Sequence, residues 1–172
     1  TLKQIQGSLQ HADDGELFLE STRGENLFFD DGRLRNASFN AAQGFGLRTI
    51  SGEVIGYAHS SDITEKAIKE AVEAVSLAVN GSPLPKQAPE LTSKQLYTAD
   101  DPMITVPFKE KVSILKEIDD YTRSLDKKVI QVSVNFGASI QEIKILRSDG
   151  RLLEDIRPMA RINISVILEE NG

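Results

Sequence analysis

Hydrophobic and polar residues alternate with a period of two, which is typical of strands, through most of residues 16–59. Leu17 and Leu19, for example, fall on one face of such a strand. Because glycine adopts a positive φ without steric cost, Asp-Gly between alternating runs favours a tight hairpin. We therefore expect an antiparallel meander of four or five strands, separated at the turn signals Arg23-Gly24, Asp30-Asp31-Gly32 and Ser51-Gly52.

A helical period replaces this alternation over residues 62–79. Asp62 and Glu65 have the spacing of a capping box, and Asn80-Gly81 is typical of a helix end. Residues 2–11 also favour a helix, with Leu2, Ile5 and Leu9 on one face. The predicted apolar face of the 62–79 helix comprises Ile63, Ala67, Ile68, Ala71, Val72, Val75 and Val79.

A second main helix is predicted from Pro107, which suits a first helical turn, to about Leu125. Its predicted apolar face comprises Phe108, Val112, Leu115, Ile118 and Leu125. Alternation then returns over 129–146. After the turn signal Ser148-Asp149-Gly150, two more strands are expected over 151–156 and 160–168.

The two main helices lie on either side of a proline-rich stretch, residues 80–106, which indicates an extended connector. The halves that it joins, 1–79 and 107–172, share one order: helix, hairpin, Asp-Gly-Arg-Leu, then more strand. This order favours an internal duplication of a helix–strand unit. We predict one α+β domain over 1–172, with antiparallel β-meanders and two main packing helices.

Composition narrows the function further. Hydrophobic residues make up 40% of the 172 residues, which is typical of a globular chain. The net charge of −6 and the lack of a basic stripe argue against a nucleic-acid partner. No apolar run approaches the roughly 20 residues that span a bilayer, so we expect no membrane partner. The absence of cysteine leaves the compartment open, and we expect a cytoplasmic location.

Gly44-Phe45-Gly46 resembles the start of a phosphate-binding loop, but it lacks a third glycine. A strand, not a helix, is expected after it, so no helix N-terminus would face a phosphate. We interpret these glycines as permitting bulges or a close approach of the backbone in curved strands.

Few residues could carry chemistry. There is no cysteine, which excludes disulfides, thiolate metal sites and a cysteine nucleophile. The two histidines, His11 and His59, lie far apart, and no His-Glu-x-x-His spacing occurs. Ser60 adjoins His59, but neighbouring strand residues point to opposite faces. We therefore predict no catalytic residue and no metal ligand in this chain.

Two arginines near the C-terminal end are the candidate site residues. Pro158 restricts its strand to a sheet edge or a bulge, and Arg157 and Arg161 flank it. The polar face of Arg161, Asn163 and Ser165 either is solvated or borders a cleft. The arginines could pair with the nearby carboxylates Glu154 and Asp155, or face a substrate channel or interface and hold a peptide.

Three segments carry a resemblance to the TldD/PmbA family, closer to the TldD branch. They are GELFLESTRGENLFFDDGRLRNASFNAAQGFGLRTISGEVIGYAHSSD, LYTADDP and SDGRLLEDIRPMARINISVILEENG. That family was first described as a modulator of DNA gyrase and later as metallopeptidases. The resemblance implies a two-domain chain whose zinc-binding His-Glu-x-x-x-His helix lies in a C-terminal domain, so this N-terminal part would hold no cofactor.

The resemblance also implies a function. Members act as homodimers, or as heterodimers with a PmbA-like subunit, and degrade unfolded or extended peptides or process peptide precursors. We therefore expect a non-catalytic domain that helps to form the dimer and to enclose the peptide channel. The alternative is a regulatory module without a protease role, which binds gyrase or a toxin–antitoxin component.

Overall fold

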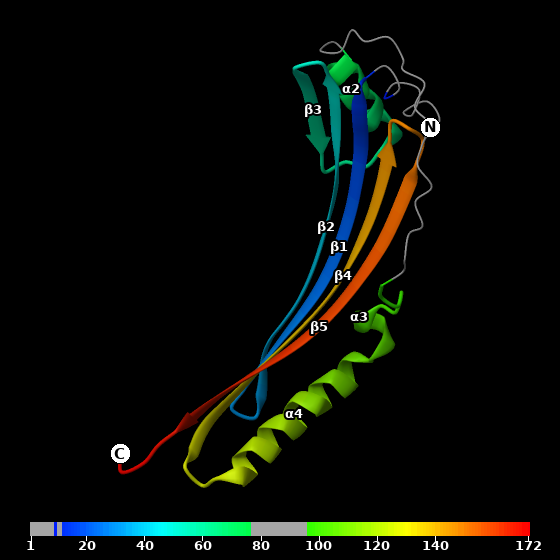
Figure 1. The fold of residues 1–172 in the computed structure, drawn as a ribbon. Coiled ribbons are helices and arrows are strands. Elements are labelled where there is room, and N and C mark those ends of the chain that lie inside the picture. The colour runs from blue at the N-terminus through cyan, green and yellow to red at the C-terminus, as the bar shows by residue number, and fades with distance from the viewer. Residues whose placement is uncertain (1–8, 10–11, 77–95) are drawn as a thin grey trace. The chain divides into compact units, whose positions relative to one another are not determined.

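A computed structural model describes residue 9, residues 12–76 and residues 96–172 (Figure 1). It confirms the α+β class, with an antiparallel five-stranded sheet in the order β3-β2-β1-β4-β5. The strands are β1 (Asp14–Asp30), β2 (Arg33–Ser51), β3 (Val54–Ser60), β4 (Val129–Arg147) and β5 (Leu152–Leu168), and the helices are α2 (Glu65–Ser76), α3 (Pro102–Thr105) and α4 (Phe108–Leu125). None of the helices in these ranges is long and apolar enough to cross a membrane.

The chain forms two compact units, each assembled from segments that alternate along the sequence. Unit 1 comprises Thr1–Thr22, Ala42–Leu96 and Gln141–Ile156, and unit 2 comprises Arg23–Ala41, Tyr97–Ile140 and Arg157–Gly172. The strands β1, β2, β4 and β5 therefore each contribute residues to both units. The internal duplication that relates residues 1–79 to residues 107–172 stays a prediction.

Helix α2 covers one face of the sheet in unit 1, next to β3 (Figure 1). Its buried residues Ile68, Ala71 and Val75 belong to the predicted apolar face. They form a core cluster with buried residues of β1, β2 and β4, namely Leu17, Phe45, Leu47 and Leu146, and with Leu9. Apart from Leu9, the residues of the predicted 2–11 helix lie outside the described residues, and so do residues 77–79.

The predicted cap of α2 is wrong in detail. The hydroxyl of Thr64, not the carboxylate of Asp62, accepts a hydrogen bond from the Ala67 N–H at 3.2 Å. Asp62 instead accepts from the Thr64 hydroxyl at 3.1 Å, which orients that hydroxyl for capping. The shift of the cap by two residues makes α2 begin at Glu65.

In unit 2 the core lies between α4 and two strands, β1 and β4. Leu115 of α4 packs in a cluster with Leu27, Phe29, Val132 and Val134. The predicted apolar face of α4 is wrong at both ends, because Phe108 and Leu125 are exposed. The residues that α4 buries are Lys111, Leu115 and Asp119, so two charged side chains occupy positions on its inner face.

The turns follow the Asp-Gly signals. Asp31 and Gly32 both have positive φ, 50° and 72°, in the β1–β2 hairpin, and Gly150 has a φ of 90° between β4 and β5. Both Asp-Gly-Arg-Leu segments thus begin at a hairpin between neighbouring strands. The predicted turn at Arg23-Gly24 is wrong, because β1 continues through it. The predicted break before residue 160 is also wrong, because β5 continues through Pro158 at the edge of the sheet.

Only the end of the predicted connector is described, since residues 80–95 lie outside the described ranges. It is not wholly extended, because α3 forms within it. Asp101 caps this short helix by accepting from the Met103 N–H at 2.9 Å.

Candidate functional site

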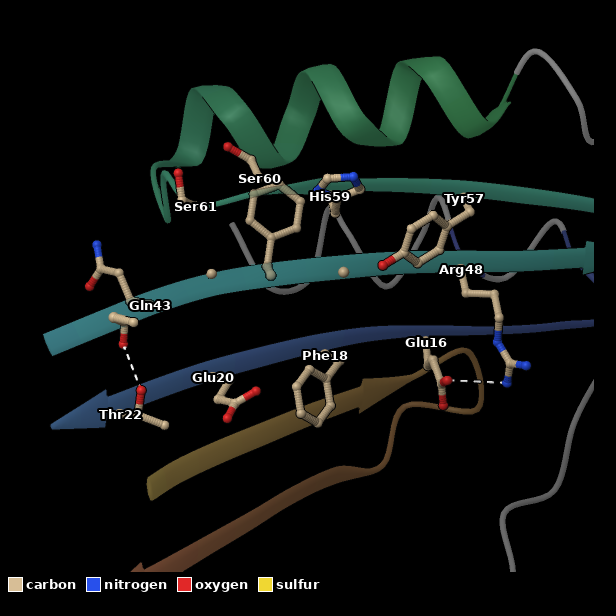
Figure 2. A pocket seen from close by; sticks show the side chains of 14 residues that line it. Glu16, Phe18, Glu20, Thr22, Gln43, Arg48, Tyr57, His59, Ser60 and Ser61 are labelled. Atoms are coloured by element: carbon tan, nitrogen blue, oxygen red, sulfur yellow. Dashed lines mark hydrogen bonds and ion pairs between the residues drawn. The ribbon is translucent and has the colours of Figure 1, made fainter. Parts of the chain in front are cut away.

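A hollow of about 580 Å³ opens in unit 1 on the strands β1, β2 and β3 (Figure 2). We call it the glycine pocket. Because side chains alternate along strands, the pocket residues Phe18 and Gly46 face away from the α2 side, on which their neighbours Leu17 and Leu47 are buried. The pocket is lined by Glu16, Phe18, Glu20 and Thr22 of β1, residues 42–46 and Arg48 of β2, Tyr57, His59 and Ser60 of β3, and Ser61.

Gly44 and Gly46 of β2 line the pocket with their backbone alone, since glycine has no side chain. Neither glycine has a positive φ, so neither is needed for a special backbone conformation. A Cβ at Gly44 would lie 3.0 Å from the Ser60 carbonyl oxygen, and one at Gly46 would lie 3.2 Å from the Tyr57 hydroxyl. The Ser60 backbone and the Tyr57 ring therefore occupy the space that side chains at these two positions would need, which agrees with the predicted close approach and not with a phosphate loop.

Aromatic rings stand on both sides of Gly46. On β3, His59 pairs with Gly46, and the Tyr57 and His59 ring centroids lie 5.7 Å apart. On β1, Glu16 contacts Arg48 and the Thr22 hydroxyl bonds to the Ala42 carbonyl oxygen. Because β1 and β2 are antiparallel, these two contacts pair Glu16 with Arg48 and Thr22 with Ala42. The same register places Phe18 beside Gly46.

The two carboxylates of the pocket differ in their partners. Glu16 Oε1 lies 3.1 Å from Arg48 Nη2, and its Oε2 lies 3.2 Å from Arg147 Nη1. Glu20 accepts a hydrogen bond at 2.6 Å from the neutral amide of Gln141. Within the described ranges, Glu20 has no cationic partner. Of the two pocket carboxylates it is therefore the one whose charge no described side chain compensates.

The pocket has no arrangement for nucleophilic or metal chemistry. The hydroxyl of Ser60 accepts from the Asp62 N–H at 3.0 Å, and Ser60 pairs with Phe45 while His59 pairs with Gly46. Among the residues that the structure describes, no group of three or more His, Cys, Asp or Glu could hold a metal ion. The prediction that this chain supplies no catalytic residue stays a prediction.

The predicted site residues Arg157 and Arg161 lie on the edge strand β5, in unit 2, whereas the glycine pocket belongs to unit 1. Arg161 is exposed, and its Nε donates to Asn163 Oδ1 at 3.0 Å. Glu154 pairs with Lys144 at 2.8 Å, and Arg157 also interacts within the protein. A contact of either arginine with a substrate stays a prediction.

Sequence reasoning missed the pocket residues Phe18, Glu20 and Tyr57. A signal was present, because alternation places Gly44 and Gly46 on one face of one strand. Their neighbours could not be identified without the register between β1, β2 and β3, which depends on contacts between positions far apart in the sequence.

Two family models match consecutive parts of the chain. The model described as "PmbA/TldA metallopeptidase domain 1" matches residues 15–78, and the "PmbA/TldA metallopeptidase central domain" matches residues 101–172. A metalloprotease TldD homolog of Haemophilus influenzae is 30% identical over 169 residues, which are 96% of this chain and 35% of that protein. A TldD homolog of Buchnera aphidicola (subsp. Schizaphis graminum) is 28% identical over 93% of this chain and 34% of its own. The chain thus spans about a third of the length of these relatives.

Crystal structures of two proteins share the fold. TldE from Thermococcus kodakarensis superposes with a TM-score of 0.71 at 16% identity, over 98% of this chain and 39% of that one. A putative modulator of DNA gyrase from Bacteroides thetaiotaomicron has a TM-score of 0.71 at 13% identity, over 99% of this chain and 42% of that one. Together with the two domain matches, which confirm the resemblance of the sequence, these findings show that the chain belongs to the PmbA/TldD family.

Proposed function

We propose that this chain is the non-catalytic N-terminal part of a TldD-like zinc metallopeptidase, where it helps to form the dimer and to enclose the channel for peptide substrates. The observation that carries the proposal is the match of residues 15–78 and 101–172 to two consecutive domains of one metallopeptidase family. The substrates are unfolded or extended peptides, and the reaction is their degradation or the processing of peptide precursors.

The exposure of strand β5 supports the proposed role in forming the dimer and enclosing the peptide channel. It is an edge strand, and from Met159 to Leu168 every residue is exposed. Its apolar residues Ile162, Ile164 and Val166 are 46%, 51% and 41% exposed. Apolar side chains in such a row favour burial against another surface. We propose that other parts of the full-length protein, or the second subunit of the dimer, cover this strand.

The sheet edges also suit the proposed substrate. An unpaired strand edge presents backbone N–H and C=O groups in a row, and an extended peptide can bind them as an added strand. Such binding uses the peptide main chain, so it tolerates many side chains. This suits an enzyme that acts on unfolded chains.

Zinc is the metal that the family implies. The described residues do not fit it, because they include no suitable group of ligands. We therefore derive no catalytic step here, and we propose that the zinc ligands belong to the rest of the full-length protein.

The test uses the full-length protein. We expect it to cleave an unfolded protein such as reduced casein, alone or with a PmbA-like subunit, and to lose this activity with a chelator. Light scattering should give the mass of a homodimer or heterodimer. If the zinc-loaded protein cleaves no unfolded substrate in either form, the proposal is wrong. Specific binding to gyrase would then favour a regulatory module, in line with the name of the Bacteroides relative.

A further inference from the structure

We infer that the chain turns back at Asn171-Gly172 and that the residues directly after Gly172 pair with β5 as a sixth, antiparallel strand. The open edge of β5 is thus an interaction surface for the protein's own next segment. The inference rests on one part of the proposed function, namely that this chain belongs to a longer protein. It goes further by identifying what covers β5.

Asn171 and Gly172 have the backbone of a hairpin turn. Their φ angles are 61° and 73°. Asp31 and Gly32, with φ angles of 50° and 72°, form the turn between β1 and β2. A two-residue type I′ turn requires positive φ at both of its central residues, and Asn-Gly is strongly preferred there. The chain after β5 therefore carries the same turn signature as the β1–β2 hairpin.

The backbone groups before this turn point in the direction that a hairpin needs. The Glu169 N–H donates to the Lys128 carbonyl oxygen at 2.9 Å, so the backbone groups of Glu169 face the β4 side. Because backbone groups alternate between the two edges of a strand, those of Glu170 face the open edge. In a two-residue hairpin the residue before the turn bonds to the residue after it. Glu170 is therefore oriented to pair with the first residue after Gly172.

The open edge of β5 lacks the features that keep an exposed edge unpaired. The sheet has two edge strands, β3 with 7 residues and β5 with 17. From Ile162 to Leu168, β5 has no charged residue and no proline. Proteins blunt exposed edges with charges, prolines or short strands, because a long apolar edge promotes aggregation. This part of β5 therefore favours an edge that is paired in the full-length protein.

The side chains of β5 also have room for neighbours on a further strand. All residues from Met159 to Leu168 are exposed. A paired strand would place one side chain directly beside each of them, which stabilises a sheet. Pro158 has no N–H to donate, so the pairing would end there. The chain spans 35% of the Haemophilus relative, so a full-length protein of that length has residues to supply the strand.

A second copy of the chain or a substrate peptide could also add a strand to this edge. Neither of them would need the chain to turn at Asn171-Gly172, because each would bring its own strand from elsewhere. The turn therefore favours the segment that is attached to it. Of the two described sheet edges, β3 is then the one that stays open to an extended peptide.

Disulfide trapping in the metal-free full-length protein tests the pairing. This chain has no cysteine, and any cysteine elsewhere would be replaced by serine. Ile167→Cys would be combined with a cysteine at the fourth residue after Gly172, which a two-residue turn places directly opposite in a non-hydrogen-bonded pair. The matched control places the second cysteine one residue earlier, where the side chain points to the other face. We expect the facing pair to form an intrachain disulfide at least about tenfold faster than the control.

Gly172→Val tests the turn, since a β-branched residue does not adopt a φ of 73° without strain. We expect it to slow the disulfide of the facing pair about tenfold. Hydrogen exchange over residues 162–168 should then show protection of only about half of the amides, those that face β4. Asn171→Gly, which keeps a positive φ accessible, is the matched control and should change neither result. Thermal unfolding shows whether each variant is folded, and the two cysteine pairs provide the test if Gly172→Val is not.

Equal rates for the facing pair and its control would overturn the inference. A disulfide between two chains, seen as a doubled mass on a non-reducing gel, would assign the edge to a second copy and would also overturn it. So would protection of β5 that appears only when an unfolded peptide is added. Neither readout needs zinc or cleavage. Intrachain trapping without cleavage would retain the added strand and remove the peptidase, and cleavage without trapping would do the reverse.

Discussion

Lys111 of α4 forms an ion pair with Glu25 of β1 in the interior of unit 2. The Lys111 side chain is 4% exposed and that of Glu25 is 14% exposed. The same ammonium donates to the Met103 carbonyl oxygen at 2.8 Å and lies 5.8 Å from the centre of the Phe136 ring. One charged side chain thus connects α4, α3 and the sheet.

We predict that Lys111→Met strongly destabilises the protein, because it leaves the Glu25 carboxylate without its cation in a site with little water. Breaking such a pair from one side costs about 3–5 kcal/mol. Urea unfolding gives the free energy. The double variant Lys111→Met/Glu25→Gln should recover part of the loss. A loss below about 1 kcal/mol for Lys111→Met would show that the pair behaves like a surface pair.

A second prediction concerns acid. Asp30 accepts hydrogen bonds from the Ser133 hydroxyl at 2.6 Å and from the Gln131 amide at 3.0 Å. These bonds, the Ser133 bond first, hold the pKa of Asp30 below its ordinary value of 3.8. The native state therefore favours the charged form. The resulting stability is present above about pH 4 and is lost as the pH falls through the lowered pKa.

Ser133→Ala removes the larger cause, so we predict that the pKa of Asp30 rises towards 3.8. An NMR titration of the Asp30 carboxyl carbon measures it directly. Ser113→Ala, which removes a hydroxyl bonded to Glu117 on the exposed side of α4, is the matched control and should leave Asp30 unchanged. An unchanged titration in Ser133→Ala would contradict the assignment of the cause.

The hairpin turns and the inner face of α4 show which parts of the fold the sequence could predict and which it could not. The hairpins at Asp31-Gly32 and at Gly150 follow from local chemistry, because a positive φ suits glycine and aspartate. The inner face of α4 does not follow, because Lys111 and Asp119 are buried with partners from distant segments or from the same helix. A pattern of hydrophobic residues cannot show that a charge is compensated.

The sequence pattern also failed to predict that β1 is continuous through Gly24, for a related reason. Gly24 looks like a turn residue, yet β1 passes straight through it because its partners on both sides keep it in the sheet. A Cβ at Gly24 would lie 2.5 Å from Asn40 Oδ1. The glycine therefore makes room for a side chain of the next strand, which sequence alone does not show.

Gly56 gives a third prediction. A Cβ there would lie 2.7 Å from Thr49 Oγ1 and 3.1 Å from Val75 Cβ, so Gly56→Ala must push α2 away from β3. We expect a loss of about 1–3 kcal/mol, which is typical of overpacking. Gly137→Ala, where space is available, should change the stability little. If both variants have the same unfolding midpoint in urea, the close approach of α2 does not depend on this glycine.

The last prediction concerns Arg161, the exposed arginine of β5. Its bond to the neutral Asn163 amide lies at the surface, so Arg161→Ala should lower the free energy of unfolding by no more than about 1 kcal/mol. If the polar face of β5 borders the peptide channel, the same variant of the full-length enzyme should lose about tenfold in kcat/KM, which corresponds to roughly 1.4 kcal/mol of transition-state binding. Arg161→Lys should recover only part of this loss, because an ammonium cannot bind a peptide carbonyl and a carboxylate with the fork of a guanidinium.

Arg157→Ala should be measured in parallel, and Arg33→Ala, at an exposed position at the start of β2, is the control that should leave kcat/KM unchanged. An Arg161→Ala enzyme with normal kcat/KM and normal stability would assign this arginine to the solvated surface and remove it from the channel.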